Sequence, residues 1–325
     1  MVQNALFISF FSALLAINAT AQHKMAVPAL PVNALLIQKT LPDSLSNRKW
    51  LVSAFHGSAY TGTLLLLNNA WYKNYPKVAL HSFNDSKEWL QVDKIGHAWS
   101  SYGLSRSSFT SWKWSGMTDK KATLLGSLSG FSFLTVIEIL DGRSQKWGWS
   151  WSDMAANAFG TGLYLGQQLA WNEQRILLKF SFHKNNYQTA PLNTRADDLF
   201  GASWYERMLK DYNGQTYWLS TNIKSLYQSS RLPPWLNIAV GYGAEGMFGG
   251  FENREIKEDG SVPFDRRDIA RVRQFYISPD IDFQRLGSKN KWVKTLCFIL
   301  NGFKFPAPAL MLDSRGNFRA YWFYF

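Results

Sequence analysis

The residues best suited to chemistry form two short patterns. Asp93 and His97 stand at positions i and i+4 in the segment DKIGH, so a helix would place both on one face. There they could share a hydrogen bond or an ion. In DMAANAFG, Asp153 and Asn157 have the same spacing, and Gly160 continues that face one turn later. The sequence therefore predicts two polar helix faces.

A further acidic residue, Glu138, lies inside the apolar run FSFLTVIEIL. A carboxylate in such a place is paired, protonated or functional, because an unpaired buried charge is too costly. We expect separate helices to bring His97 to Glu138 or Asp153, since each group would otherwise lack a partner in an apolar setting.

Two interpretations of this cluster follow from its residue types. It can be a structural polar network, in which Lys94 or His97 neutralises the acids and fixes the helix register. It can also be a hydrolytic site, with a histidine or carboxylate as general base and with or without a divalent metal. The catalytic candidates are then Asp93, His97, Glu138 and Asp153.

A third interpretation is a pocket for lipid or glycan headgroups. Arg106 and Arg143 would contact phosphate there, and Lys94 and Asn157 are further binding candidates. A zinc site is disfavoured because the cluster holds one histidine and no HExxH or paired-His spacing. A serine hydrolase is disfavoured because G-x-S-x-G is missing. The residues identify no cofactor and define no metal site.

The order of DKIGH, Glu138, Asp153, Asn157 and Gly160 resembles the YfiM-type predicted periplasmic lipoproteins, a family of unknown function. More distantly it resembles the VanZ-like membrane proteins, which are associated with resistance to glycopeptide antibiotics. The resemblance covers roughly residues 50–172. It implies a location and a helical fold, but no reaction. The chain departs from the lipoprotein description because no cysteine follows its N-terminal apolar run.

The N-terminal residues predict export. Residues 5–17 are apolar but too few to span a bilayer, and Ala19-Thr20-Ala21 has the small-x-small pattern of a cleavage site. We therefore expect residues 1–21 to be a signal peptide, although the first twenty residues contain no Lys or Arg. Residues 22–50, with three prolines, are expected to form an N-terminal segment.

Composition favours an envelope partner. The net charge is +12, but the basic residues are scattered and no nucleic-acid module frames them. Anionic lipid headgroups or cell-wall polyanions fit an exported basic chain better. The 15 Trp, 14 Tyr and 23 Phe include the residue types that gather at membrane boundaries. We expect membrane lipid or another envelope component as partner, no nucleic acid, and a location on the periplasmic side, at the outer membrane.

The middle of the chain predicts a helical domain over residues 51–174. Its helices are expected at 51–72, 92–102 extending toward 109, 121–140 and 151–171. Ser152 could cap the last of them. The links at 107–121 and 141–152 place Trp beside Lys, Arg and Ser, as turns at a membrane surface do. A four-helix membrane-associated bundle is the expected arrangement.

Residues 175–325 are expected to be β-rich, which makes the fold class α+β. The candidate strands are YWLSTNI, WLNIAVGYGAEGMFGG, VRQFYISPDIDF, WVKTLCFIL and FRAYWFYF. The aromatic last strand is typical of outer-membrane barrels, but about six strands fall short of eight, so an open layer packed on the helices is favoured.

The lone His56, His81 and Cys297 are interpreted as structural residues. The glycines of GYGAEGMFGG are interpreted as strand bends, because no Lys-Ser/Thr follows to hold a phosphate. Two functions remain open: an envelope protein without enzymatic activity that scaffolds or binds lipid, and a membrane-embedded enzyme acting on a lipid or cell-wall precursor.

Overall fold

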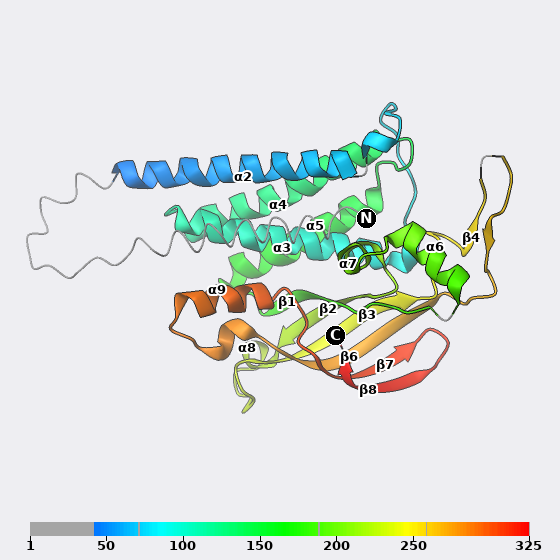
Figure 1. Ribbon diagram of the computed structural model, residues 1–325. Coiled ribbons are helices and arrows are strands. Elements are labelled where there is room, and N and C mark those ends of the chain that lie inside the picture. Colours follow the sequence, from blue (N-terminus) through cyan, green and yellow to red (C-terminus); the bar gives the residue numbers. More distant parts are fainter. Residues whose placement is uncertain (1–41, 71, 188, 258, 325) are drawn as a thin grey trace, which may run out of the picture.

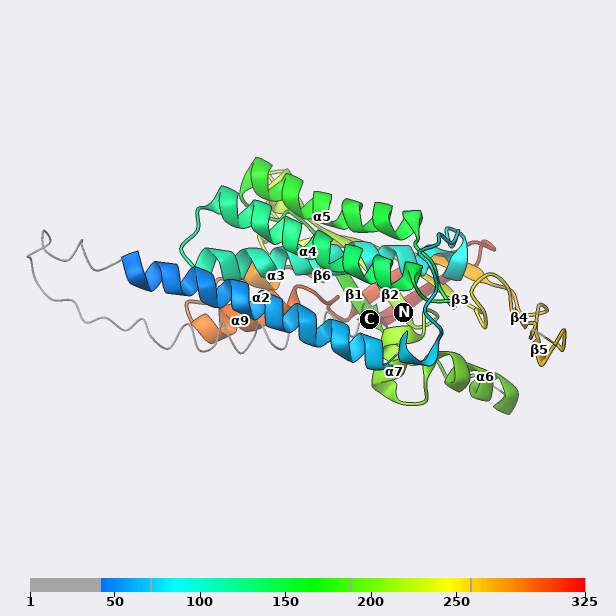
Figure 2. The same ribbon diagram turned by 90° about the horizontal axis from the view of Figure 1, so that it is seen from above.

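The computed structural model describes residues 42–70, 72–187, 189–257 and 259–324 (Figure 1). The expected signal peptide and residues 22–41 of the N-terminal segment lie outside these residues. The described chain is α+β, with long helices running side by side over an antiparallel sheet (Figures 1 and 2). The predicted fold class is therefore confirmed at the level of α+β.

Four long helices form the helical layer: α2 (Pro42–Ala70), α3 (Val92–Trp114), α4 (Asp119–Gly142) and α5 (Trp151–Trp171). The first begins earlier than expected, so residues 42–50 belong to it and not to a separate segment. The second is longer than expected, because the serines of residues 107–114 bury their small side chains inside the helix layer. The expected link at 107–121 is therefore mostly helix.

Helix α5 has the bounds that were expected, but its cap is different. The side chain of Ser150 accepts a hydrogen bond from Asp153 N, whereas Ser152 lies inside the helix. Trp147, in the turn before α5, is half-buried and packs edge-on against the ring of Tyr72. Trp151 is 72% exposed.

Helix α3 lies between the other helices and the sheet. It packs closely on α4 and α5, and Trp99 contacts Phe180 and Tyr217 of the sheet. Tyr60 of α2 reaches Ser129 of α4 with a hydrogen bond of 2.6 Å. Within the described residues, α4 is the one helix long and apolar enough to cross a membrane, and about half of it is buried against its neighbours. Core helices share these properties, so this is weak evidence for a span.

The sheet has six antiparallel strands in the order β1-β2-β3-β6-β7-β8. Two further strands of two residues each, β4 and β5, pair with each other in a separate hairpin. An open layer packed on the helices was expected, and the strand order agrees with it. The strand bounds are β1 (Ile176–Phe182), β2 (Gln215–Asn222), β3 (Leu236–Glu245), β4 (Arg254–Glu255), β5 (Phe264–Asp265), β6 (Val272–Ile281), β7 (Ala307–Asp313) and β8 (Phe318–Tyr324).

One predicted strand is wrong. WVKTLCFIL forms helix α9 (Lys291–Leu300), because Asn290 caps its first turn and Val293, Leu296, Cys297 and Leu300 share one helical face. Cys297 is buried, as expected for a structural cysteine. The C-terminal region contains further short helices: α6 (Ala190–Phe200), α7 (Trp204–Lys210), α8 (Ile223–Leu226), and the 3-10 turn η4 (Phe283–Leu286). Two similar turns precede α3: η2 (Tyr72–Asn74) and η3 (Glu88–Gln91).

The two faces of the sheet differ in chemistry. On the face turned away from α3, which we call the inner face, Trp218, Tyr276 and Tyr324 form a small second core. The ion pair between Lys179 and Asp280 is fully buried beside it, with 2.8 Å between Nζ and Oδ2. The opposite face, beyond the strands that α3 covers, carries exposed apolar side chains.

Candidate functional site

The predicted contact of His97 with Glu138 or Asp153 across a helix interface is confirmed, and both residues lie close to it. His97 of α3 has its Nδ1 3.2 Å from Asn157 Oδ1 and 3.4 Å from Glu138 Oε1. Its Nε2 lies 3.5 Å from Asp153 Oδ1. All four side chains are buried. Glu138 comes from α4, and Asn157 and Asp153 come from α5, so the two predicted polar faces meet around one imidazole.

Lys94 is the cationic centre of the cluster. Its ammonium lies 2.5 Å from Asp85, 2.8 Å from Asp153 and 3.1 Å from Asp93. Asp85 is fixed in turn by the hydroxyls of two serines in the turn that starts α5, at 2.6 and 2.7 Å. One ammonium therefore faces three carboxylates.

A left-handed turn places Asp93 and Lys94 at the start of α3. Trp89, Leu90 and Gln91 have φ angles of 48°, 50° and 64°, values that side chains other than glycine adopt at a cost. Arg273 of the sheet holds this turn, because its guanidinium donates hydrogen bonds to Leu90 O at 3.0 Å and to Gln91 Oε1 at 2.5 Å. The sheet thus fixes the first turn of the helix that carries the site.

Gly160 sets how closely α5 approaches α3. A Cβ at this position would lie 2.0 Å from Ala98 O and 2.2 Å from Ser101 Oγ. Glycine therefore allows the backbones to come together one turn beyond Asn157, which is the physical reason for a glycine at that place in the pattern.

The cluster lies at the wall of a cavity of about 430 Å³. Asp93, His97 and Asp153 line it, together with Glu88 and Asp141. These side chains are therefore within reach of a small molecule or ion and are not sealed in a packed core. Asp93, His97 and Asp153 each offer a ligand atom, and these atoms lie within 4.8 Å of one another.

Burial and neighbouring charges give the ionisable groups of the site different protonation states. Burial, reinforced by neighbouring carboxylates, raises the pKa of Glu138 to about 10, and burial raises the pKa of Asp153 well above its ordinary value. Burial also lowers the pKa of His97 to about 3. Burial would raise the pKa of Asp93 as well, but the charge of Lys94 together with other contacts, among them the hydrogen bond from Tyr212, outweighs burial and holds that pKa below its usual range. At neutral pH the site combines a neutral imidazole with a protonated and an ionised carboxyl group.

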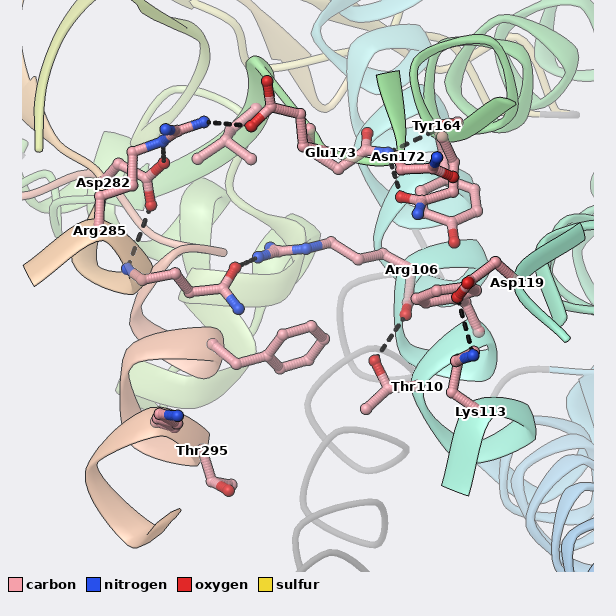
Figure 3. A pocket seen from close by; sticks show the side chains of 17 residues that line it. Arg106, Thr110, Lys113, Asp119, Tyr164, Asn172, Glu173, Asp282, Arg285 and Thr295 are labelled. Atoms are coloured by element: carbon pink, nitrogen blue, oxygen red, sulfur yellow. Dashed lines mark hydrogen bonds and ion pairs between the residues drawn. The ribbon is translucent and has the colours of Figure 1, made fainter. Parts of the chain in front are cut away.

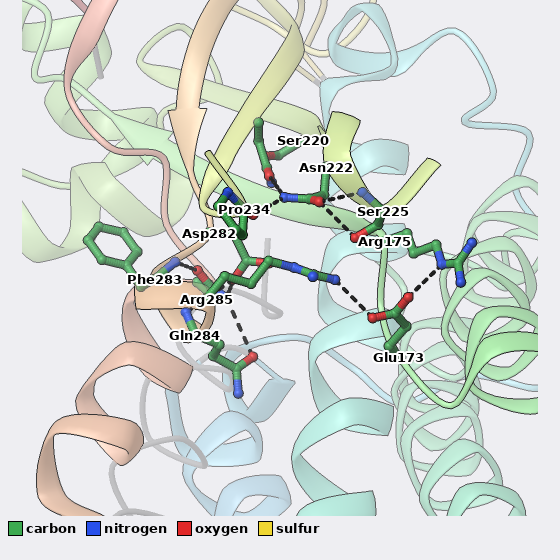
Figure 4. A network of polar contacts seen from close by, with 12 residues as sticks. Glu173, Arg175, Ser220, Asn222, Ser225, Pro234, Asp282, Phe283, Gln284 and Arg285 are labelled. Carbon is green, nitrogen blue, oxygen red and sulfur yellow. Dashed lines mark hydrogen bonds and ion pairs between the residues drawn. The ribbon is translucent and has the colours of Figure 1, made fainter. Parts of the chain in front are cut away.

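The two arginines of the headgroup interpretation lie elsewhere and apart. Arg106 lines a separate cavity of about 760 Å³ and stacks over the ring of Phe298 (Figure 3). Arg143 follows the end of α4 and is exposed. They do not form one pocket, because they come from opposite ends of the paired helices α3 and α4. Beside the Arg106 cavity, Arg285 bridges Glu173 and Asp282 at 3.0 and 2.9 Å (Figure 4).

Several residues of the site were not predicted, Glu88 among them. Asp85 lies in a loop, and Tyr212 lies between α7 and β2 and donates a hydrogen bond of 2.7 Å to Asp93. Neither has a spacing that links it to the cluster. Asp141 stands at i+3 from Glu138 on the same helix and accepts a hydrogen bond from Tyr72, so helical periodicity could have indicated it.

The isolated His56 has the buried surroundings expected of a structural histidine. His56 is buried and lies 3.2 Å from Ser111 Oγ, and burial lowers its pKa to about 4. His81 is exposed on a loop. The glycine-rich segment ends strand β3 and continues as a loop that begins at Gly246, where φ is +77°.

A family model described as a predicted periplasmic lipoprotein (DUF2279) matches residues 82–166. This segment contains Asp85, Lys94, His97, Glu138 and Asp153. The match supports an envelope location on the periplasmic side and the resemblance in its broad form, and it gives no support to the narrower YfiM or VanZ-like relation. No curated protein and no solved structure matches the chain.

Proposed function

We propose that this is an envelope protein that binds membrane lipid through the outer face of its sheet. The observation that carries the proposal is an apolar row across five strands. Paired residues of neighbouring strands share a face, and the pairing joins Leu219, Val240, Ile277, Leu310 and Ala320. Val240 is 55% and Ile277 50% exposed.

A second row runs beside the first. It joins Tyr242 to Phe275, Phe275 to Leu312 and Leu312 to Phe318. The last three are exposed. Two adjacent apolar rows make a continuous patch, and large exposed apolar patches mark surfaces that contact a membrane or a partner.

The inner face of the same strands is partly polar, with the buried Lys179–Asp280 pair and hydroxyls such as Ser220. Apolar residues outside and polar residues inside are the reverse of a water-facing sheet and the pattern of strands that face lipid. This inversion supports a lipid surface over a second soluble protein as the occupant.

The outer face also holds a groove of about 800 Å³. Leu232, Ile238, Ile277, Leu310 and Trp322 line it. Trp322 of the last strand is 84% exposed, a placement that suits the boundary between headgroups and acyl chains. A net charge of +12 would favour anionic headgroups.

The exposed patch lies on the sheet beyond the strands that α3 covers, so we propose that this part of the sheet lies against the outer membrane and that the protein acts there as a scaffold. We also propose the VanZ-like relation and a membrane-associated helical bundle. The order of the polar residues on α3, α4 and α5 supports the VanZ-like relation, and the length and apolar composition of α4 support contact of the helices with a membrane.

Vesicle flotation of the purified full-length chain tests the proposal. Vesicles of phosphatidylethanolamine and phosphatidylglycerol should carry the wild-type chain upward, also in high salt, because apolar burial is not screened. Ile277→Asp and Leu310→Asp should reduce the floated fraction strongly. Leu286→Asp, at an exposed apolar position of η4, is the matched control and should float like wild type. A wild-type chain that stays at the bottom, or an Ile277→Asp variant that floats unchanged, would disprove the proposal.

A second candidate function is a hydrolase or transferase that acts on a lipid or cell-wall precursor. The open cavity beside His97 favours it, because a purely structural network has no need of access to solvent. Purified chain would be incubated with labelled phospholipid vesicles and with labelled cell-wall precursor. If the site is catalytic, His97→Asn abolishes product release while the chain stays folded and abundant. Loss of abundance together with activity would indicate a structural role.

A further inference from the structure

The wall of the polar cavity has the spacing of a metal site. His97 Nε2 and Asp153 Oδ1 are 3.5 Å apart. Two atoms bound to one tetrahedral ion at ~2.0–2.1 Å lie about 3.3 Å from each other. Asp93 supplies a further carboxylate oxygen within the same 4.8 Å limit. One nitrogen and two oxygens can therefore reach a common point with small movements.

The Nδ1 side of the His97 imidazole has the kind of neighbours that metal-binding histidines have. The Nδ1 side of His97 faces Asn157 Oδ1 at 3.2 Å and Glu138 Oε1 at 3.4 Å, which directs Nε2 toward Asp153. Histidines that bind metals usually donate their second N–H to such a carboxylate or carbonyl oxygen, and this fixes the tautomer.

Glu138 is a buried carboxyl group that faces His97 across a helix interface. Its side chain is 1% exposed, and no side chain of the described residues makes a hydrogen bond to either of its oxygens. A buried carboxyl group in that condition is costly. A cation on the far side of the imidazole would polarise the N–H that faces Glu138 and strengthen that contact.

Lys94 would compete with a metal ion, but it need not block one. Its ammonium contacts Asp93 and Asp153, and also Asp85, which lies outside the ligand set. The flexible four-carbon stem lets the ammonium stay with Asp85 while an ion takes the other two carboxylates. The hydroxyls of Ser150 and Ser152 keep Asp85 in place.

We propose that Asp93, His97 and Asp153 bind a divalent cation of the Zn²⁺ or Mn²⁺ type, with Glu138 orienting His97. A mixed nitrogen and oxygen ligand set suits such borderline cations better than Ca²⁺. The site stands independently of the lipid-binding surface, and it would give the second candidate function a Lewis acid.

The test is metal binding by the full-length chain. After treatment with EDTA and buffer exchange, the folded protein is titrated with Zn²⁺ alone, and in parallel with Mn²⁺, against a chromophoric chelator. Wild type should bind one equivalent. His97→Gln and Asp153→Asn should weaken binding about 100-fold or more, and Glu138→Gln about 10–100-fold. Lys94→Met should bind more tightly, because it removes the competing ammonium.

Asp141→Asn and His81→Gln are the matched controls. Asp141 lines the same cavity but is held by Tyr72, and His81 is exposed away from it. Both should bind like wild type. The proposal is overturned if folded wild type binds neither cation in stoichiometric amount, a result that needs no variant. It is also overturned if folded His97→Gln binds as tightly as wild type.

Discussion

Tyr212 donates a hydrogen bond to Asp93, and 119 residues of chain separate the two. Asp93 lies in the first turn of α3, whereas Tyr212 lies just before β2 and beyond the segment that matches the periplasmic lipoprotein family. The C-terminal region therefore completes a site whose other residues come from the helices. The two parts of the chain therefore meet at the candidate site.

Tyr212→Phe should lower the free energy of unfolding by about 1.5–3 kcal/mol, because a buried, ionised carboxylate loses a donor. Chemical denaturation followed by circular dichroism would measure the change. Tyr205→Phe is the control, since Tyr205 is 55% exposed and should change stability by less than about 0.5 kcal/mol. Equal effects of both substitutions would show that the contact to Asp93 is unimportant.

Alanine substitution at two glycines of α5 should change the stability of the fold in opposite directions. Gly160→Ala should destabilise the fold by about 1–3 kcal/mol, because the added Cβ would press on the backbone of Ala98. Gly162→Ala meets nothing within 4 Å and should stabilise it by about 0.5–1 kcal/mol, since alanine favours a helix. Thermal unfolding of the matched pair measures both. A tolerated Gly160→Ala would contradict the close approach of α5 to α3.

His56 should make stability depend on pH in mildly acidic solution. Burial lowers its pKa from 6.5 to about 4, so between these values the unfolded chain binds a proton that the folded chain does not. Stability from this residue is therefore complete above pH 6.5 and is lost as the pH falls toward 4, by at most about 1.4 kcal/mol per unit. Denaturation of His56→Gln between these limits should show a slope smaller by this amount.

Breaking the buried ion pair of the sheet should be costly. Lys179→Met leaves Asp280 without its closest cation in a fully buried place, and the expected loss is about 3–5 kcal/mol. Removing Arg266 from its exposed pair with Asp268 should change stability much less, because solvent screens that pair. Urea denaturation would compare them. A small effect of Lys179→Met would mean that Lys304, 3.8 Å from Asp280, replaces the missing cation.

Helical periodicity gave the bounds of α5, because apolar and small residues repeat regularly from Trp151 to Trp171. In α3 the predicted helix ended too early, because its second half is rich in serine and carries Arg106. Those serines are buried because their neighbours in space are small, and a single sequence does not reveal which residues pack together. Short apolar runs were ambiguous for the same reason, and residues 292–300 satisfy both a strand and a helix until Asn290 is recognised as a cap.

The candidate site was predictable where its residues share a helix face. Spacing within α3 and α5 indicated His97 and Asp153, and the apolar surroundings of Glu138 made it conspicuous. The loop residue Asp85 and the distant Tyr212 were not predictable, because their contacts depend on how the sheet and the loops pack against the helices. Arg106 and Arg143 do not share one pocket as expected, because the charge of a residue does not indicate the direction in which its side chain points.

The segment between α9 and β7 runs along the free side of β1. Phe180 N donates to Gly302 O at 3.0 Å, and Lys304 N donates to Phe180 O at 2.9 Å. Unpaired strand edges are templates for strand addition and aggregation. Within the described residues, the chain therefore occupies part of one edge of its sheet with its own backbone and leaves β8 as the accessible edge. Assembly of copies by strand pairing would therefore be favoured at β8, beside the exposed Trp322.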